Sequence, residues 1–439
     1  MASHKSILDK SKNFIKNGII KNKNVSYNLN YFLSSWAESI GYLNLKNFSK
    51  KKVNYFLKFL IIFKEFYTLN KSYLENTDIK SNQKYKKIIF SYFVSKNLKK
   101  NGSYFDKYFS FNTDLNKEIL WILIPLTNNN KNYKTKNNVI ILKRRSFNFF
   151  KNFITSIYFY IKNLFLSYFF TNNINLKFIE PIFFKNLFEI INLQLLKHNI
   201  KKLYFPYEAQ PHQHYLVSKL KKTKIKLKII GYMHTVLPPL PIDYIKRPGH
   251  PDLVYVNGKQ QKKIMCNKLG WNGNEVKNIT SFRYKKNQPM LSSRILLPYF
   301  IEDVNKIFNL IKNLILTRPK KFFPKFLIRN HPSMGASKRH KSLIKKIRFF
   351  LNSNKKLFKN KPSNKKISIF IGSTASAAEG LERGLRVFHI CADPFFEKFN
   401  SFYWDKVLSI NLNENIFEYK LIDKGSIIKF GNSKNKSIS

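Results

Sequence analysis

Acidic residues and cysteines are both scarce in this chain of 439 residues. Lys and Arg number 80 against 24 Asp and Glu, which gives a formal net charge of +56. The two cysteines, Cys266 and Cys391, are far apart and follow no paired spacing. The sequence therefore predicts neither a disulfide framework nor a zinc site, and it favours a reducing compartment. No short-period repeat is visible, which argues against a repeat architecture.

Long apolar segments are also missing. Residues 1–18 contain no apolar core of the kind a signal peptide needs. The longest apolar region, residues 147–170, includes Lys151 and Lys162, whereas a membrane-spanning helix needs about 20 mostly apolar residues. Two alternatives remain for this region: a buried core helix, or an amphipathic helix on a membrane surface. We therefore expect a cytoplasmic protein, with peripheral attachment to the inner face of the cell membrane as a further possibility.

The positive charge is spread along the whole sequence rather than gathered in one motif. Lysines occur almost evenly from Lys5 to Lys436, together with an excess of Asn, Ile, Phe and Tyr. These residues have A/T-rich codons, so genome composition explains much of the bias, and we expect no specific nucleic-acid partner. Anionic lipid headgroups attract a basic protein whatever the origin of its charge. A non-enzymatic protein that binds membrane or nucleic acid through charge alone is one hypothesis.

What the chain does contain is typical of a globular α/β protein. The hydrophobic fraction is 44% and the aromatic fraction 16%, and the length allows two domains with full cores. Short apolar runs alternate with helical stretches, which predicts parallel sheets. We expect a helical N-terminal extension (residues 1–80, with helices at 27–39 and 53–69), a first α/β domain (81–288) and a second (289–439). The predicted strands are 87–94, 119–125, 139–142, 203–206, 225–232, 253–257, 294–298, 325–329, 367–371 and 387–390.

The most informative stretch is residues 367–390, which read as a strand, a turn of small residues, a helix, a second turn and a strand. The turn begins at Gly372, and hydroxyl side chains follow at Ser373, Thr374 and Ser376. Free backbone N–H groups, hydroxyls and the positive end of a helix together suit a phosphate. Alternatively, the hydroxyls cap the helix, with Ser376 and Glu379 as a capping box. That alternative leaves Ser373 and Thr374 unexplained.

Ligands of open α/β sheets bind at the carboxyl ends of the strands, so polar residues that follow strands are candidates. Glu208 follows the predicted strand 203–206. Burial would tune its pKa towards neutrality, as a general base requires. The alternative is that Glu208 caps the next helix. The amide and imidazoles that come next are candidates for binding an acceptor substrate, namely Gln210, His212 and His214.

Three further strand ends carry candidates. His234 follows strand 225–232 and could bind substrate, act as a base, support Glu208 or be purely structural. Gly258 follows strand 253–257 and allows either a close backbone approach or a left-handed turn. Strand 325–329 ends in Arg329-Asn330-His331-Pro332, where the proline favours an extended backbone and ends the strand. A permanent cation and an imidazole at this position suit a phosphate, although a plain strand-ending turn is the alternative.

These motifs, in this order, resemble the donor-binding domain of GT-B glycosyltransferases. The likeness lies in a strand followed by RNHP, and then in GSTASAAEGLERG between two strands. It is greatest to the bacterial surface-carbohydrate enzymes that include capsule and polysialic acid transferases. The segments LYFPYEAQPHQH, IIGYMHT and PDLVYVNG resemble the acceptor half of such proteins, and the likeness covers about residues 85–410. It implies two Rossmann-like domains facing each other across a cleft, without a cofactor or catalytic metal, and no convincing Asp-x-Asp motif is present.

The resemblance also implies roles for individual residues. His331 and the hydroxyls after Gly372 would contact the donor phosphate, Glu379 would hold the donor ribose, and Glu208 would be the base. The sequence departs from the family pattern at Arg386, where the family usually has a proline. The implied activity is that of an inverting glycosyltransferase, which moves a sugar from a nucleotide-activated donor such as a CMP-sugar to a surface polysaccharide or lipid-linked glycan. A CDP-polyol phosphotransferase of a surface polymer is the alternative enzyme.

Overall fold

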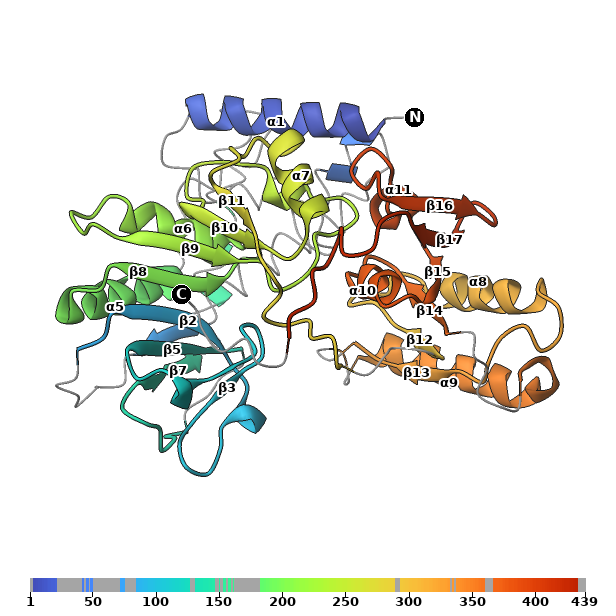
Figure 1. Cartoon of the computed structure of the whole chain (residues 1–439), viewed down its shortest axis with the longest axis horizontal. Coiled ribbons are helices and arrows are strands. Elements are labelled where there is room, and N and C mark those ends of the chain that lie inside the picture. Colours follow the sequence, from blue (N-terminus) through green and yellow to red (C-terminus); the bar gives the residue numbers. More distant parts are fainter. Residues whose placement is uncertain are drawn as a thin grey trace.

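The fold is described from a computed structural model. The residues described are 3–21, 42, 45–46, 48–49, 72–75, 84–126, 131–146, 150, 153–154, 157–158, 161, 182–288, 293–331, 334, 337–359 and 366–432. The predicted helices at 27–39 and 53–69, and Pro332 of the predicted site, lie outside these residues. Figure 1 shows two α/β lobes side by side, each built on its own sheet.

The first sheet has seven strands in the order β11-β10-β9-β8-β2-β5-β6, and every neighbouring pair is parallel. The chain adds strands outward from β2 on one side and then restarts at β8 on the other. Connections therefore diverge between β2 and β8, where α/β sheets open a binding crevice at their carboxyl ends. The strands are β2 Lys87–Phe93, β5 Ile119–Pro125, β6 Val139–Ile141, β8 Lys202–Pro206, β9 Lys228–Tyr232, β10 Leu253–Val256 and β11 Val276–Asn278. The predicted parallel sheet is confirmed.

The second sheet has six strands in the order β13-β12-β14-β15-β17-β16. The first four are parallel, and connections diverge between β12 and β14, so a second crevice is expected there. The last two are antiparallel and were not predicted. The strands are β12 Arg294–Leu296, β13 Leu327–Arg329, β14 Ile367–Ile371, β15 Arg386–Ile390, β16 Val407–Asn411 and β17 Ile416–Leu421.

Helices cover both sheets, and buried contacts join the two lobes. Trp404 donates its indole N–H to the carbonyl of Pro239 (3.2 Å), and the Gln260 side chain donates to the carbonyl of Tyr403 (2.9 Å). One apolar core runs continuously through residues of both lobes. The principal helices are α5 Ile182–His198, α6 Pro211–Leu220, α7 Lys259–Asn267, α8 Val304–Leu316, α9 Lys338–Ser353, α10 Ser376–Glu382 and α11 Pro394–Glu397.

The N-terminal region packs on this body. Helix α1, His4–Lys21, lies across the top of the molecule, and its His4 ring stacks on Phe395 with 4.5 Å between centroids. The region is not wholly helical as predicted, because strand β1, Ser72–Glu75, pairs antiparallel with β7, Lys143–Ser146. The N-terminal region therefore contacts both lobes.

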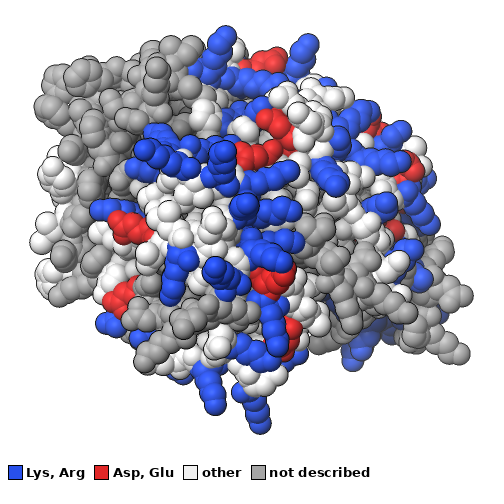
Figure 2. All heavy atoms as spheres, turned by 60° about the vertical axis from the view of Figure 1, so that its left-hand side comes forward, with Lys and Arg blue, Asp and Glu red and all other residues white. Residues whose placement is uncertain are grey.

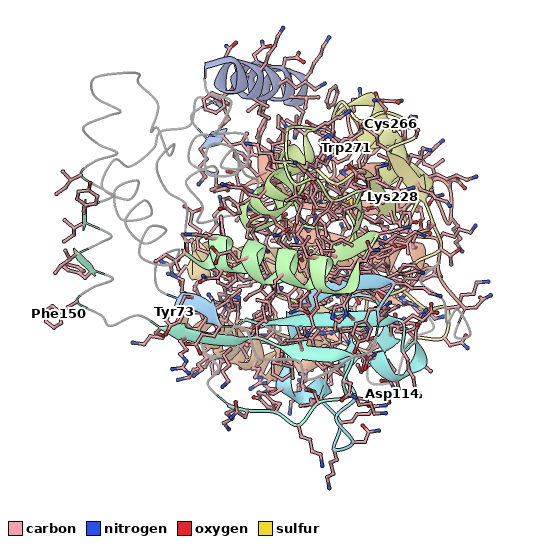
Figure 3. The ribbon with its side chains drawn as sticks, turned by 90° about the vertical axis from the view of Figure 1, so that its left-hand side faces the viewer. Tyr73, Asp114, Phe150, Lys228, Cys266 and Trp271 are labelled. Atoms are coloured by element: carbon pink, nitrogen blue, oxygen red, sulfur yellow. The ribbon has the colours of Figure 1, made fainter. Side chains whose placement is uncertain are left out.

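The predicted helix at residues 147–170 is described only at a few positions, all of them helical. Their large side chains are exposed, including 70% of Phe150, 63% of Ile154 and 58% of Tyr158. Phe150 lies at the edge of the molecule, away from both sheets (Figure 3). These positions do not fit the buried alternative. Among the residues that the structure describes, none of the helices combines the length and apolar character needed to cross a bilayer.

On the face of the molecule shown in Figure 2, the basic side chains of the described residues are scattered and do not form one patch. On the face in Figure 2, Lys and Arg occur across the whole described area, with acidic residues between them. This distribution agrees with the even spacing of lysines along the sequence.

Gly258 is required by a close approach, not by its own backbone dihedral. A Cβ atom at this position would lie 1.9 Å from the carbonyl oxygen of Ile427, where the C-terminal segment crosses from the second lobe to the first. We expect Gly258→Ala to lower the free energy of unfolding by about 1–3 kcal/mol, because the crossing segment must move. Thermal denaturation measures this. The matched control is Gly273→Ala, where the new Cβ meets nothing within 4 Å, and we expect a change within about 0.5 kcal/mol. Equal melting temperatures for both variants would contradict the close approach.

Candidate functional site

A cavity of about 380 Å³ lies where the carboxyl ends of the two sheets meet. It brings together eight of the residues predicted from the sequence: Glu208, Arg329, His331, Gly372, Ser373, Thr374, Ser376 and Glu379. His234 lies directly behind Glu208. Gln210, His212 and His214 are not among the lining residues. Residues more than 160 positions apart in the chain thus share one cavity, because they follow strands that end at the same place.

Glu208 is held on the first lobe by a tight turn after β8. The next residue, Ala209, is fully buried and has a left-handed backbone (φ +54°), which is a strained conformation for a residue with a side chain. The Gln213 side-chain carbonyl accepts hydrogen bonds from the backbone N–H of Glu208 (3.0 Å) and of Gln210 (3.2 Å). Gln210 and Gln213 form the capping box of α6, so capping does not need the Glu208 side chain.

The two histidines after Glu208 are part of the interior. His214 places Nδ1 3.0 Å from the carbonyl oxygen of Gly249 and Nε2 2.9 Å from the guanidinium of Arg247. His212 Nε2 lies 3.1 Å from the hydroxyl of Tyr92. Pro211 starts α6 at its first position, and neither imidazole on this helix lines the cavity.

Glu208, which is half-buried, and the buried His234 form a polar pair. His234 Nε2 lies 3.2 Å from Glu208 Oε1, and the His234 side chain is only 3% exposed. Burial raises the pKa of Glu208 from its ordinary value of 4.5 to about 7, and the nearby Arg283 charge opposes that rise. Burial, assisted by Arg283, holds the pKa of His234 well below its usual range. At neutral pH the imidazole is therefore neutral, and its Nε2 lies beside a Glu208 carboxyl group that can gain or lose a proton.

Arg329 and His331 stand on the opposite side of the cavity, at the end of β13. The Asn330 side chain accepts from the backbone N–H of His331 (2.9 Å) and donates to the carbonyl of Met334 (3.2 Å), which shapes the turn. The Tyr299 ring meets the His331 imidazole edge-on, with 5.3 Å between centroids. Burial, with a smaller effect of His340, lowers the pKa of His331. This wall offers a permanent cation and a neutral imidazole N–H.

Gly372 opens the turn after β14 with a left-handed backbone (φ +67°), and a Cβ there would lie 2.9 Å from Cβ of Pro298. The Thr374 hydroxyl accepts from the backbone N–H of Ser376 (3.2 Å). The predicted capping box of Ser376 and Glu379 is wrong: Ala375 is the N-cap and has no side-chain cap bond. Glu379 instead pairs with Arg383 on the next helical turn. The hydroxyls therefore stand at the cavity rather than serving as a capping box.

Several lining residues were missed by the sequence analysis. Glu397 follows β15 by a few residues, so the strand-end rule could have found it. Burial, together with the charges of Asp393 and Glu302, raises its pKa to about 7. Arg283 was hidden among 80 basic residues. The N-terminal region contributes Tyr42, which no pattern in the sequence indicated.

Metal binding has no support from side-chain clusters. Within the described ranges, no group of three or more His, Cys, Asp or Glu side chains is placed to hold a metal ion. Cys266 and Cys391 are free thiols.

Comparison with known proteins gives little. No family model matches the sequence, and no curated protein matches it. Among solved structures, the chain is similar to a glycosyltransferase from Rickettsia africae ESF-5. The two are 11% identical over 73% of this chain and 88% of that chain, with a TM-score of 0.32. At that score the two backbones superpose too loosely to identify a fold or a function.

Proposed function

We propose that this protein is a glycosyltransferase that moves a sugar from a nucleotide-activated donor to a glycan acceptor. The observation that carries the proposal is the composition of the cavity where the carboxyl ends of the two sheets meet. Glu208, a carboxyl group with a pKa of about 7, lies on one wall. A guanidinium, an imidazole and three hydroxyls lie on the other. A base that faces an anion-binding wall is the arrangement that sugar transfer from a nucleoside phosphate requires.

The reaction that fits this arrangement is a direct displacement. The Glu208 carboxylate takes the proton of an acceptor hydroxyl, with His234 donating to Glu208 and holding its orientation. The acceptor oxygen then bonds to the anomeric carbon while the bond from that carbon to the donor phosphate oxygen breaks. The electron pair leaves with the phosphate, whose charge is stabilised by Arg329, His331 and the Ser373–Ser376 hydroxyls. One displacement inverts the anomeric configuration.

The finer assignments rest on the sequence motifs. We propose two Rossmann-like domains meeting near residue 288 in a GT-B arrangement, with Glu379 holding the donor ribose and a CMP-sugar as the donor. A surface polysaccharide or lipid-linked glycan is the proposed acceptor. The exposed apolar side chains between residues 150 and 161, on a chain of charge +56, support peripheral contact with an anionic membrane from the cytoplasmic side.

Turnover should depend on pH through Glu208. Its carboxyl group must be ionised to accept a proton, so kcat/KM should rise about tenfold per pH unit below pH 7 and level off above it. A pH profile of kcat/KM with a fixed donor and acceptor measures this. Glu208→Gln should lose the rising limb along with most activity. A flat profile between pH 5.5 and 8 would contradict the assignment of Glu208 as the base.

Product analysis tests the proposed function directly. The protein would be incubated with CMP-, UDP- and GDP-sugars or a CDP-polyol, together with fluorescent lipid-linked oligosaccharide primers. Mass spectrometry would then distinguish a glycoside from a phosphodiester. A new glycoside is the expected product. A phosphodiester would replace the proposal by polyol-phosphate transfer. Lack of any product, with salt-sensitive binding that survives the loss of Glu208 and His331, would indicate binding through charge alone.

A further inference from the structure

Residues 281–288, here called the connector segment, lead from the first lobe towards the second and form part of the cavity wall. Arg283 and Tyr284 of this segment line the cavity. The segment has no regular secondary structure apart from an isolated bridge between Lys285 and Gly431. Backbone hydrogen bonds tie it to the C-terminal segment: Ser281 N–H donates to the carbonyl of Lys429 (2.8 Å), and Gly431 N–H donates to the carbonyl of Tyr284 (2.8 Å). Side chains that bind its backbone add a second set of contacts, towards the second lobe.

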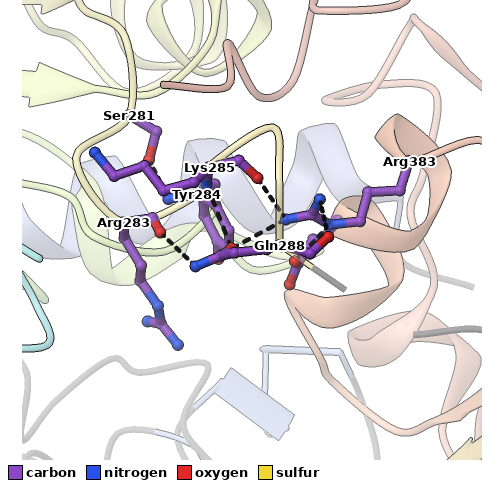
Figure 4. A network of polar contacts seen from close by, with 7 residues as sticks. Ser281, Arg283, Tyr284, Lys285, Gln288 and Arg383 are labelled. Carbon is purple, nitrogen blue, oxygen red and sulfur yellow. Dashed lines mark hydrogen bonds and ion pairs between the residues drawn. The ribbon is translucent and has the colours of Figure 1, made fainter. Parts of the chain in front are cut away.

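Arg383 supplies much of that binding from α10 (Figure 4). Its Nε donates to Glu379 Oε1 (2.8 Å), while Nη1 and Nη2 donate to the carbonyls of Gln288 (3.4 Å) and Lys285 (3.3 Å). Nη2 also donates to the Gln288 side chain (3.0 Å), and the guanidinium lies 4.6 Å from the centroid of Phe430. One side chain, 4% exposed, thus joins α10, the connector segment and the C-terminal segment.

The geometry uses features that only arginine has. The fork of Arg383 directs one edge at Glu379 and the other at the connector backbone, and a lysine ammonium cannot reach both at once. Burial of the guanidinium is compensated because it meets a carboxylate, two carbonyls and a side-chain amide. Arg383 therefore makes more polar contacts at the junction of the lobes than the stability of α10 alone would require.

The connector segment in turn places Arg283 in the wall of the cavity that Glu208 also lines. Backbone N–H groups of Phe282 (3.0 Å) and Arg283 (3.3 Å) donate to the hydroxyl of Tyr232, at the end of β9. On the other side, Gln288 Nε2 donates to the carbonyl of Arg283 (3.1 Å), and Arg383 holds Gln288. The Arg283 guanidinium, directed away from Arg383 in Figure 4, acts electrostatically on Glu208 and His234. Arg283 is thus fixed between the first sheet and α10.

We propose that Arg383 is a positioning residue: it ties the connector segment to α10 and so fixes where the Arg283 charge stands relative to Glu208. The inference deepens the proposed function and rests on it for the role of Glu208. Arg383 thereby makes α10 and the connector segment move together. Glu379 of α10 faces the donor side of the cavity, and Arg283 of the connector segment faces the base. A shift of α10 on donor binding would then alter the proton affinity of the base.

Other groups also act on Glu208 and stay unchanged in the test. They come from β2, the loop after the short strand β3 (Phe105–Asp106), the end of β9 and the loop before β10, and comprise Tyr92, Tyr108, His234 and Tyr244. The three tyrosines are neutral at the pH values of interest, because burial raises the pKa of each. Arg283 is therefore the charged group acting on Glu208 whose position the Arg383 substitution should change.

The test compares pH profiles of kcat/KM for the wild type, Arg383→Lys and Arg386→Lys. Arg386 is a matched control, because it makes a two-bond ion pair with Glu418 (2.8 and 3.0 Å) and does not line the cavity. In Arg383→Lys, the connector segment loosens and the Arg283 charge moves away. The midpoint of the rising limb should then move up by about 0.5–1 pH unit, part of the 1–3 units that a close opposite charge produces. Arg386→Lys should keep the wild-type midpoint.

A second readout needs no turnover. Burial makes the protonated form of Glu208 the stable one in the native state, so its contribution to stability is full below pH 4.5 and is lost as pH rises through about 7. For the wild type and for Arg383→Lys, Tm is compared with that of the same protein carrying Glu208→Gln, and the difference isolates this loss of stability. In Arg383→Lys the loss should continue to a higher pH than in the wild type. The measurement remains valid if no glycoside product is ever found, so failure of the proposed function and failure of this inference are distinguishable.

If Arg383→Lys does not fold, Gln288→Ala takes its place in the test. Gln288 is exposed, so we expect this variant to fold. It removes the link between Arg383 and the Arg283 carbonyl and should move the midpoint in the same direction by a smaller amount. If the variants that fold have the wild-type midpoint in both readouts, whatever their melting temperatures, Arg383 is purely structural and the inference is overturned.

Discussion

Replacing Glu208 by glutamine should reduce kcat by about 10²–10⁴-fold, the usual contribution of a general base. The amide keeps the size of the side chain and can still contact His234, but it cannot accept a proton. KM for the donor should change little, because the donor phosphate is bound on the opposite wall of the cavity. Steady-state kinetics with saturating acceptor measures both quantities.

Glu275→Gln is the matched control for this variant. Glu275 is half-buried like Glu208 and pairs with Lys246 at 2.8 Å, but it lies outside the cavity. This variant should retain wild-type kcat. If Glu208→Gln kept more than a tenth of wild-type kcat, Glu208 would not be the base.

Replacing His331 by alanine should reduce kcat/KM by about 10²–10³-fold, because the leaving phosphate loses a hydrogen-bond donor in a partly enclosed site. The fold should remain, since the His331 side chain is part of the cavity wall and the turn is shaped by Asn330. Kinetics and circular dichroism of the same preparation separate loss of activity from loss of structure.

His250→Ala is the corresponding histidine control. His250 packs edge-on against Trp271, 4.8 Å between centroids, and does not line the cavity. Its loss should cost stability and leave kcat/KM within about twofold per active molecule. Unchanged kcat/KM in His331→Ala would remove the donor-side assignment of this wall.

The α/β core of the fold could be predicted because its strands are buried on both faces and read as continuous apolar runs. The unit at residues 367–390 appears as β14, α10 and β15, each within a residue or two of its predicted bounds. Strands β16 and β17, which pair antiparallel at one side of the sheet, were missed. The residues of β16 are mostly partly exposed, whereas the first four residues of β17 are buried. Their pattern of apolar residues is too weak to separate from that of a loop.

The position of the candidate site could be predicted only as far as the order and direction of the strands determine it. Glu208, His331 and the Gly372 turn were found because each follows a parallel strand, and the carboxyl ends of such strands converge. His212 and His214 do not line the cavity, since helix α6 begins between them and Glu208, and their contact with an acceptor stays a prediction. Arg283 could not be distinguished, since one basic residue among 80 carries no signal until the fold puts it beside a carboxylate.

The most direct test of the central claim is a thermal-shift measurement with CMP, CDP, UDP and GDP. It would use the wild type, Glu208→Gln and His331→Ala. A ligand that binds the native state stabilises it by about 2.7 kcal/mol at a hundredfold excess over its Kd. We expect one nucleotide to raise Tm in the wild type and in Glu208→Gln, and we expect this rise to be largely lost in His331→Ala. No rise with any nucleotide at millimolar concentration, or an equal rise in all three proteins, would contradict a donor site in this cavity.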